Sequence, residues 1–338
     1  MRCRKQRGVA LIIALILVAL AAILATKLSF DGWLEQRRTL GILAAEQALH
    51  FCMGAEALAA DVLSQQNGQS DTLADPWAQP TVPMPLTPEN NPEGEPIGSL
   101  QGALEDMEGR FNLNNLGRAA QTPAGSGVQS PGVAAGGFDP QPLEQFRRLL
   151  ISVGLEPKWA GIARDWITST DVPSSPDGAK DSIYTSQTPP YRTGEYPMMS
   201  PTELMNLPGF GADRYRKIAP YVTALPTATA AINICTASGP VLDSLLPDSL
   251  SNEYTGNPQL LVAERKKGCF PDVPTFTNIL NSVSGTALKL HDRFTDKTSY
   301  FRLTTRVTLG TTEFTLYSLL HRNLSGKVTP LLRTFGTP

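Results

Sequence analysis

The chain has 338 residues, 41% of them hydrophobic, and a formal net charge of -2 at pH 7. This length and composition allow one large or two small domains with a buried core, and they exclude a disordered protein. The near-neutral charge provides neither a broad basic field for nucleic acid nor an acidic field for a polycation. Long-range electrostatics therefore say little about function.

The N-terminus combines a basic leader with an uninterrupted apolar segment. Four basic residues lie within residues 1–7, Gly8 follows them, and the run VALIIALILVALAAILA extends from Val9 to Ala25. The basic flank is expected to stay in the cytoplasm, and the run is at the short limit for crossing a bilayer. No small-residue cleavage site follows it. These features are typical of an ordinary signal anchor, but the position of Gly8 between the basic residues and the apolar run indicates a more specialised N-terminus.

Helical periodicity continues well beyond the apolar run. Over residues 27–65, apolar positions recur at helix-like spacing between charged ones, and no proline occurs before Pro76. One continuous helix from Val9 to Gln65 would extend roughly 85 Å, because each helical residue adds about 1.5 Å. We expect its first half to lie in a membrane and its second half to pack on a globular head.

The segments that follow suggest the first half of that head. Residues 67–98 are rich in Pro, Gly, Gln and Asn and predict an extended loop or a weak strand. Residues 100–116 alternate as a strand pair, on which Asp106 and Glu108 are expected to face solvent. A low-complexity stretch covers residues 119–137, and helical patterns then fill residues 139–225.

After Pro226 the pattern mixes short strands with helices. INICTAS predicts a strand, PTFTNILNSV predicts a short helix, and residues 299–323 alternate as two strands that turn near Gly310. This order favours an α+β fold in which a helical block interrupts one α/β unit. Two independent tandem domains are the alternative, but they would leave the strand near residues 110–114 without its sheet.

The N-terminus resembles that of type IV pilins and pseudopilins, in which a prepilin peptidase cuts after the leader glycine. By that resemblance the cut falls between Gly8 and Val9, and Val9 becomes the methylated N-terminus. Most such proteins carry Glu at the fifth mature position, where it can neutralise the N-terminal amine of a neighbouring subunit. Ile13 stands at that position here. This departure suits a subunit that has no neighbour ahead of it, at a filament tip.

Six further segments resemble general secretion pathway protein K, the large minor pseudopilin of type II secretion. They are EDMEGRFNLNNL (105–116), ARDWI (163–167), DGAKDSIY (177–184), PPYRTGEYP (189–197), ELMNLPGFG (203–211) and INICTAS (232–238). The resemblance implies a pilin-like α/β head with an inserted α-helical domain. It also implies a subunit that is not an enzyme and that assembles with two other minor pseudopilins at the tip of a periplasmic pseudopilus.

Pattern and resemblance together divide the chain into six parts. They are a cleaved leader (1–8), a transmembrane part of the helix (9–26), a periplasmic part (27–66), a first part of the α/β head (67–117), the inserted helical domain (118–225) and a second part of the head with the hairpin (226–338). The expected location is the bacterial inner membrane, with the N-terminus cytoplasmic and the C-terminal region periplasmic. The implied partners are other minor pseudopilins, the major pseudopilin, the prepilin peptidase and the inner-membrane assembly platform.

Members of that family can bind calcium in the loop that follows the ARDWI helix. The candidate ligands here are Asp165, Asp171, Asp177, Asp181 and Glu195. Such an acidic loop is chemically sensible, because Ca²⁺ takes six to eight oxygen ligands. However, Thr168 and Thr170 stand where acids are expected, and Lys180 replaces a glutamate. The alternatives are therefore a calcium site and a solvated loop held by its aromatic side chains.

Cysteines and a hairpin-like segment leave two further questions open. Cys235 and Cys269 could pair if this region is exported, although the sequence does not give the distance between them. Residues 206–222 resemble a single helix-hairpin-helix whose amides, together with Arg214, Arg216 and Lys217, could hold a DNA phosphate.

Nucleic-acid binding is not favoured, because only one copy of the hairpin is evident and salt-dependent DNA binding needs several phosphate contacts. The competing function is a minor pilin of a type IV pilus or DNA-uptake filament whose helical domain binds DNA or another ligand. A gel shift at varied salt would separate the two functions. Catalysis has little support, since His50, His291 and His321 are dispersed and no nucleophile or phosphate-loop motif occurs.

Overall fold

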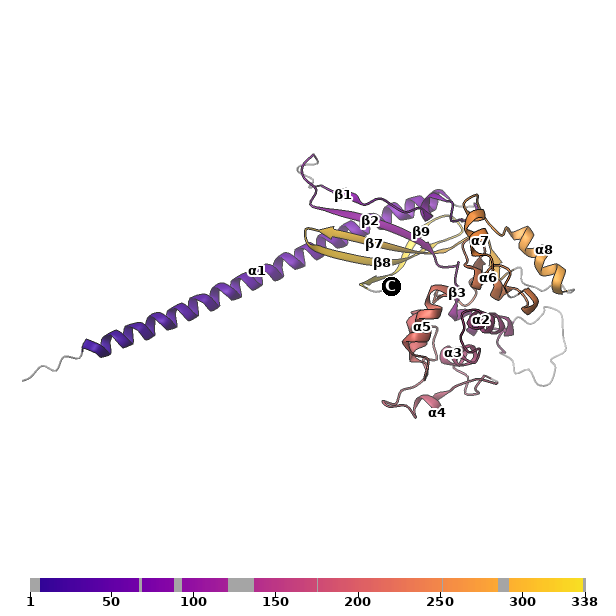
Figure 1. Ribbon diagram of the computed structural model, residues 1–338, viewed down its shortest axis with the longest axis horizontal. Coiled ribbons are helices and arrows are strands. Elements are labelled where there is room, and N and C mark those ends of the chain that lie inside the picture. Colours follow the sequence, from indigo (N-terminus) through magenta and orange to yellow (C-terminus); the bar gives the residue numbers. More distant parts are fainter. Residues whose placement is uncertain are drawn as a thin grey trace, which may run out of the picture.

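The computed structural model describes residues 7–66, 69–87, 93–120, 137–174, 176–250, 252–284 and 292–336. Its longest element is α1 (Arg7–Gln65), a single helix of 59 residues. The N-terminal half of α1 extends far beyond the rest of the molecule (Figure 1). Its most apolar stretch has a mean hydropathy of 3.1 and is wholly exposed. The expected continuous helix is confirmed. Most of the expected leader (residues 1–6) and most of the low-complexity stretch (residues 121–136) lie outside the described residues.

A five-stranded antiparallel sheet forms the head, in the order β1-β2-β7-β8-β9. The strands are β1 (Met84–Leu86), β2 (Gly98–Asp106), β7 (Tyr300–Leu309), β8 (Thr312–Arg322) and β9 (Val328–Phe335). The hairpin predicted around Gly310 is confirmed, and Gly310 has a positive φ of 57° that suits the tight turn. Because β2 pairs with β7 from Gly98↔Leu309 to Asp106↔Phe301, two distant parts of the chain build one sheet.

The predicted strand pair over residues 100–116 is wrong. Only β2 belongs to the large sheet, and β3 (Phe111–Asn112) instead pairs in parallel with β4 (Val222–Thr223). The Asp106 carboxylate causes the change of direction, since it accepts hydrogen bonds from the backbone N–H groups of Glu108 (2.7 Å) and Gly109 (3.2 Å). Such a local turn competes with further strand pairing.

Short helices fill most of the chain between β2 and β7. The α-helices are α2 (Pro140–Ser152), α3 (Trp159–Ile167), α4 (Asp181–Tyr184), α5 (Gly211–Ile218), α6 (Gly239–Leu245), α7 (Pro258–Arg265) and α8 (Val273–Ser284). The 3₁₀ turns are η1 (Pro76–Ala78), η2 (Leu113–Gly117), η3 (Pro201–Asn206), η4 (Ala219–Tyr221) and η5 (Asp248–Leu250), and a second short parallel pair joins β5 (Ile232–Asn233) to β6 (Phe294–Thr295). The helix start expected at Ser200 is present as a capping box with Glu203, although the turn that it begins is 3₁₀.

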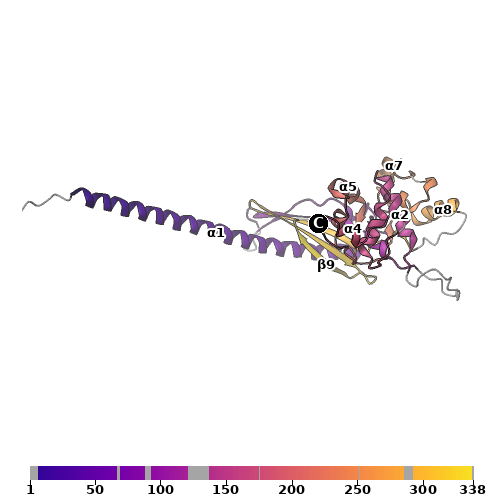
Figure 2. The ribbon, with the colours of Figure 1, turned by 90° about the horizontal axis from the view of Figure 1, so that it is seen from below.

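The α-helices between β2 and β7 share one hydrophobic core, and we call this part of the protein the helical domain. Its buried cluster includes residues from Phe111 to Phe294, with the rings of Phe111 and Phe146 stacked at 5.1 Å. The domain is therefore larger than the expected insert 118–225, because α6, α7 and α8 pack into the same core. It lies at the end of the head farthest from the N-terminal half of α1 (Figures 1 and 2).

The C-terminal half of α1 packs on the sheet through small residues. Ala48, Cys52 and Ala55 contact apolar side chains of β1, β2, β7 and β8, and one helical turn further on Ala59 and Leu63 continue the contact. Within this interface Glu56 is only 6% exposed. It accepts hydrogen bonds from the Ser318 hydroxyl and from Arg333 at 2.9 Å (Nε) and 2.8 Å (Nη2). Glu56 thus fixes the register of α1 against β8 and β9.

Replacing Glu56 should loosen the helix from the sheet. We expect Glu56→Ala to lower the free energy of unfolding by about 2 kcal/mol, because Ser318 and Arg333 lose a buried charged acceptor. Chemical denaturation of the full chain in detergent measures the change. Glu46→Ala, an exposed acid on the same helix, is the matched control and should leave the midpoint unchanged. Equal midpoints for both variants would contradict this role of Glu56.

Candidate functional site

The N-terminal half of α1, which extends beyond the head and which we call its free half, contains the predicted processing and assembly positions. Gly8 and Val9 lie in its first turns, and Ile13 is 53% exposed. The apolar side chains of this half, from Val9 to Leu24, are all at least half exposed, so the described head leaves them uncovered. Exposed alanines are interspersed among them and permit close approach of another helix. This surface requires lipid or other helices as its environment.

The five candidate calcium ligands lie in the last turn of α3 and in the acidic loop between α3 and η3. Asp171 and Glu195 are exposed, and Asp177 is 4.0 Å from the Arg147 guanidinium. Asp181 accepts hydrogen bonds from Thr193, at 3.0 Å from the amide and 2.8 Å from the hydroxyl. Across the part of the chain that the structure describes, no group of three or more acidic, His or Cys side chains is arranged to hold a metal ion.

Asp165 is the buried member of the set, at 1% exposure. Its carboxylate accepts hydrogen bonds from the backbone N–H groups of Ser174 and Ala179, both at 2.9 Å, and from the Ser174 hydroxyl. Gly178 permits this approach, because a Cβ there would lie 2.3 Å from the Asp165 carboxylate. Asp165 therefore organises the loop through protein donors.

The arrangement does not fit calcium. Both oxygens of Asp165 are occupied by N–H and O–H donors, and the Lys180 ammonium takes the neighbouring backbone oxygens of Asp165 and Thr168. A divalent cation needs six to eight oxygen ligands, and here it would also meet a positive charge. Of the residues predicted as ligands, Asp165 and Asp181 instead accept hydrogen bonds from protein donors of the same segment.

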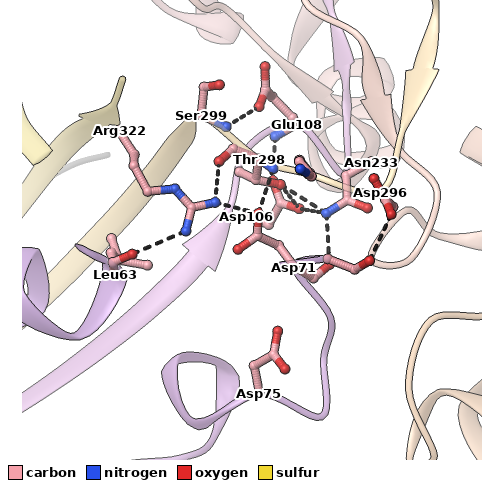
Figure 3. A network of polar contacts seen from close by, with 12 residues as sticks. Leu63, Asp71, Asp75, Asp106, Glu108, Asn233, Asp296, Thr298, Ser299 and Arg322 are labelled. Carbon is pink, nitrogen blue, oxygen red and sulfur yellow. Dashed lines mark hydrogen bonds and ion pairs between the residues drawn. The ribbon is translucent and has the colours of Figure 1, made fainter. Parts of the chain in front are cut away.

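A buried polar network lies where α1, the sheet and the helical domain meet (Figure 3). The Arg322 guanidinium donates to the backbone oxygens of Leu63 (3.1 Å) and Thr298 (2.7 Å) and to the Asp71 carboxylate. Asn233, from β5, donates to the Asp71 backbone oxygen (3.0 Å). The network therefore ties the end of α1 to β8 and to the helical domain.

Two further carboxylates complete the network, contrary to the expectation that they face solvent. Asp106 and Glu108 are 6% and 7% exposed, because the helical domain covers the end of β2. Asp106 accepts hydrogen bonds from Asn233 (2.9 Å) and Thr298 (2.6 Å), and Glu108 accepts one from the Ser299 amide. The clue available in the sequence was the D-x-x-G spacing of residues 106–109, which is typical of a turn.

Burial and mutual repulsion keep these carboxyls from ionising easily. Desolvation raises the pKa of Asp71 and of Asp106, and hydrogen bonds to each oppose it. For Glu108, desolvation together with the charges of Asp106 and Asp71 raises the pKa to about 8. Glu108 thus holds a proton in the folded state at neutral pH.

A disulfide crosslinks the helical domain. It joins Cys235, which follows β5, to Cys269, which precedes α8, with their Cα atoms 4.5 Å apart. Disulfides are typical of exported regions and rare in the reducing cytosol.

The segment that resembles a helix-hairpin-helix uses two of its three candidate cations in contacts within the protein. Arg214 pairs with Glu156, at 3.2 Å from each carboxylate oxygen, and lies over the Trp159 ring at 5.3 Å. Arg216 pairs with Asp213 on the same helix. These contacts pack α5 against the start of α3 and pair two of the three candidate cations with acids, while Lys217 is exposed.

Known proteins resemble the chain over nearly its whole length. The type II secretion system protein K of Pseudomonas aeruginosa is 30% identical over 345 residues, which cover 98% of this chain and 94% of that protein. The protein K of Aeromonas hydrophila is 29% identical over 341 residues, which cover 99% and 98%. The chain belongs to the type II secretion system protein K family.

Protein K is a minor pseudopilin. A family model and a solved structure both agree with the assignment of this chain to the protein K family. The family model "Type II secretion system (T2SS), protein K" matches residues 109–227, which include the first half of the helical domain. A chain of the crystal structure of the GspK-GspI-GspJ complex from enterotoxigenic Escherichia coli has the same fold, with a TM-score of 0.70 at 23% identity. That likeness covers 89% of this chain and 100% of the other. The pilin-like α+β fold that the sequence predicted is confirmed.

One surface of this pseudopilin exposes several apolar side chains beside the sheet. A groove of about 700 Å³ lies between the helical domain and the β8–β9 edge of the sheet. The exposed apolar side chains that line it are Tyr196, Met199, Leu331 and Leu332. Exposed apolar patches beside a sheet edge are typical of protein–protein contact sites.

Glu108 should make the stability of the protein pH-dependent. Because the folded state holds a proton that the unfolded chain releases above its ordinary pKa of 4.5, stability should fall as pH rises from there to about 8. The slope for one proton is at most about 1.4 kcal/mol per pH unit. We expect Glu108→Gln, which keeps the neutral form, to flatten this fall.

Denaturation midpoints measured across this pH range test the prediction. Glu46→Gln, on the exposed face of α1, is the control and should keep the wild-type slope. An unchanged slope in Glu108→Gln would show that Glu108 is not the group that titrates.

Proposed function

We propose that this minor pseudopilin forms or initiates the tip of the periplasmic pseudopilus, and that it supports protein secretion across the outer membrane without being an enzyme. The observation that carries the proposal is the position of the helical domain, at the end of the head farthest from the anchor helix (Figures 1 and 2). Pilin-like subunits join a filament from the membrane. The helical domain covers the end of the head that points away from the membrane, so no further subunit can pack there. This subunit would therefore be the first to be incorporated into the filament.

The orientation in the membrane follows from charge. The basic residues before Gly8 favour a cytoplasmic N-terminus, and α1 then delivers the head to the periplasm. The disulfide between Cys235 and Cys269 supports an oxidising compartment for the head. In this arrangement the prepilin peptidase cuts between Gly8 and Val9, and the assembly platform of the inner membrane receives the mature chain.

Ile13 supports the same position in the filament. A glutamate at the fifth mature residue would place a charge in lipid, and the amine of an adjacent subunit is the partner that compensates it. Ile13 has no charge to compensate and is exposed on the free half of α1. A subunit with Ile there gains nothing from a neighbour ahead of it.

A glutamate at this position should change where the subunit is incorporated. We expect Ile13→Glu to raise the ratio of this chain to the major pseudopilin in sheared filaments by several-fold and to reduce secretion. Quantitative immunoblotting gives the ratio, and N-terminal sequencing verifies that each variant begins at Val9. Ile16→Glu carries the same charge nearly one turn later and is the control. A wild-type ratio with wild-type secretion in Ile13→Glu would refute the tip assignment.

Other minor pseudopilins are the proposed occupants of the groove beside β9. The similar Escherichia coli chain was crystallised in a GspK-GspI-GspJ complex, so that protein assembles with two others. In this chain Leu331 and Leu332 are 49% and 42% exposed on β9, which forms one edge of the sheet. An edge strand with apolar side chains can accept the head of a second pilin-like subunit.

A charge in this groove should weaken the tip complex. We expect Leu332→Arg to reduce co-purification of the other minor pseudopilins at least about tenfold, since an unpaired charge is costly in an apolar interface. Leu324→Arg is the matched control, because Leu324 is fully exposed in the loop between β8 and β9, outside the groove. Equal recovery of partners with both variants would place the interface elsewhere.

A further inference from the structure

The ammonium group of Lys180 is surrounded by oxygens in the manner of a bound cation. The residue is 8% exposed. Its Nζ donates to the backbone oxygens of Asp165 at 2.9 Å and Thr168 at 2.6 Å, and the Thr168 hydroxyl oxygen is 3.4 Å away. Asp165 lies in the last turn of α3 and Thr168 is its C-cap, where the helix dipole favours a positive charge.

Acidic groups around the lysine favour its charged form. Burial lowers the pKa of Lys180, whereas the charges of Asp165, Glu195, Asp171 and Asp181 act in the opposite direction. These are four of the five carboxylates that the sequence suggested as calcium ligands. Their charge is therefore directed at an ammonium group that belongs to the chain itself.

Lys180 also closes the loop mechanically. It stands immediately before α4, twelve residues after Thr168, so its contact joins the end of α3 to the start of α4. The Asp165 carboxylate holds Ser174 and Ala179 from the other side. The connection between the two helices is thus attached to α3 by one negative and one positive side chain.

We propose that the Lys180 ammonium is a tethered cation that takes the place of a divalent metal ion, so that the loop from Thr168 to Glu195 keeps its fold without calcium. A calcium ion in the same place would have to displace the ammonium from the oxygens of Asp165 and Thr168. The displaced charge would remain nearby and repel the ion. This inference does not depend on the position of the subunit in the filament.

The wild-type chain provides the first test. We expect the melting temperature of the full chain in detergent to be the same in EDTA and in millimolar CaCl₂. Terbium, a luminescent calcium probe, should give no emission sensitised by Trp166, whose backbone oxygen accepts a hydrogen bond from Glu195 in this loop. A calcium-dependent rise in melting temperature, or saturable terbium emission, would overturn the proposal whatever the variants do.

Two variants test the role of the ammonium itself. Lys180→Met should lower the melting temperature by about 5 °C, because two buried backbone oxygens lose their donor. It should also speed cleavage by a Glu-specific protease at the exposed Glu195 by about tenfold, through local opening of the loop. Lys180→Glu should be destabilised in EDTA and should regain several degrees with CaCl₂, together with terbium emission.

Lys217→Met and Lys217→Glu are the matched controls, since Lys217 is exposed on α5. Both should behave as the wild-type chain in every measurement. Lys180→Met with wild-type stability and wild-type cleavage would show that the ammonium does not hold the loop, and the proposal would fail.

Discussion

The contact between Arg322 and its three acceptors holds the head together. Its guanidinium binds the backbone oxygen of Leu63 at the end of α1, the carboxylate of Asp71 in the segment that follows, and the backbone oxygen of Thr298 before β7. It also stacks over the Phe301 ring at 5.1 Å. Asn233 of the helical domain extends this set of contacts, since it donates to the backbone oxygen of Asp71 and to the hydroxyl of Thr298. The direction of α1 relative to the head and the attachment of the helical domain therefore both depend on the Arg322 contacts.

The buried polar network restricts the conformation of the head, but burying its charged groups costs free energy. Three buried carboxyl groups, those of Asp71, Asp106 and Glu108, belong to the network, and among them the Arg322 guanidinium pairs with Asp71. One oxygen of Asp71 has no hydrogen-bond partner. Buried polar groups stabilise less than an apolar core of equal volume, but they permit fewer alternative arrangements. For a subunit that must present a large domain at a fixed angle to its anchor, that restriction has mechanical value. The apolar clusters on either side supply the stability.

Local sequence patterns predicted correctly those elements that are held by contacts between residues close together in the sequence. The continuous α1, the hairpin at Gly310 and the capping box at Ser200 each follow from spacing within a short window. The edge strand β9 and the true extent of the helical domain were missed, because both depend on pairing and packing with distant residues. Asp106 and Glu108 were assigned to solvent for the same reason. Alternation shows that two residues share a face, but not what covers that face.

The acidic loop illustrates a related limit on ligand prediction. The resemblance to protein K suggested a calcium site built from five acids, yet the side chain of Lys180 reaches two backbone oxygens of this segment, those of Asp165 and Thr168. The negative charges of the nearby carboxylates therefore act on the Lys180 ammonium and not on a bound metal ion. An ion binds according to its concentration in the periplasm, whereas a tethered ammonium is always present at its site. On the proposal made for Lys180, the order of this loop therefore depends on the fold and not on the medium.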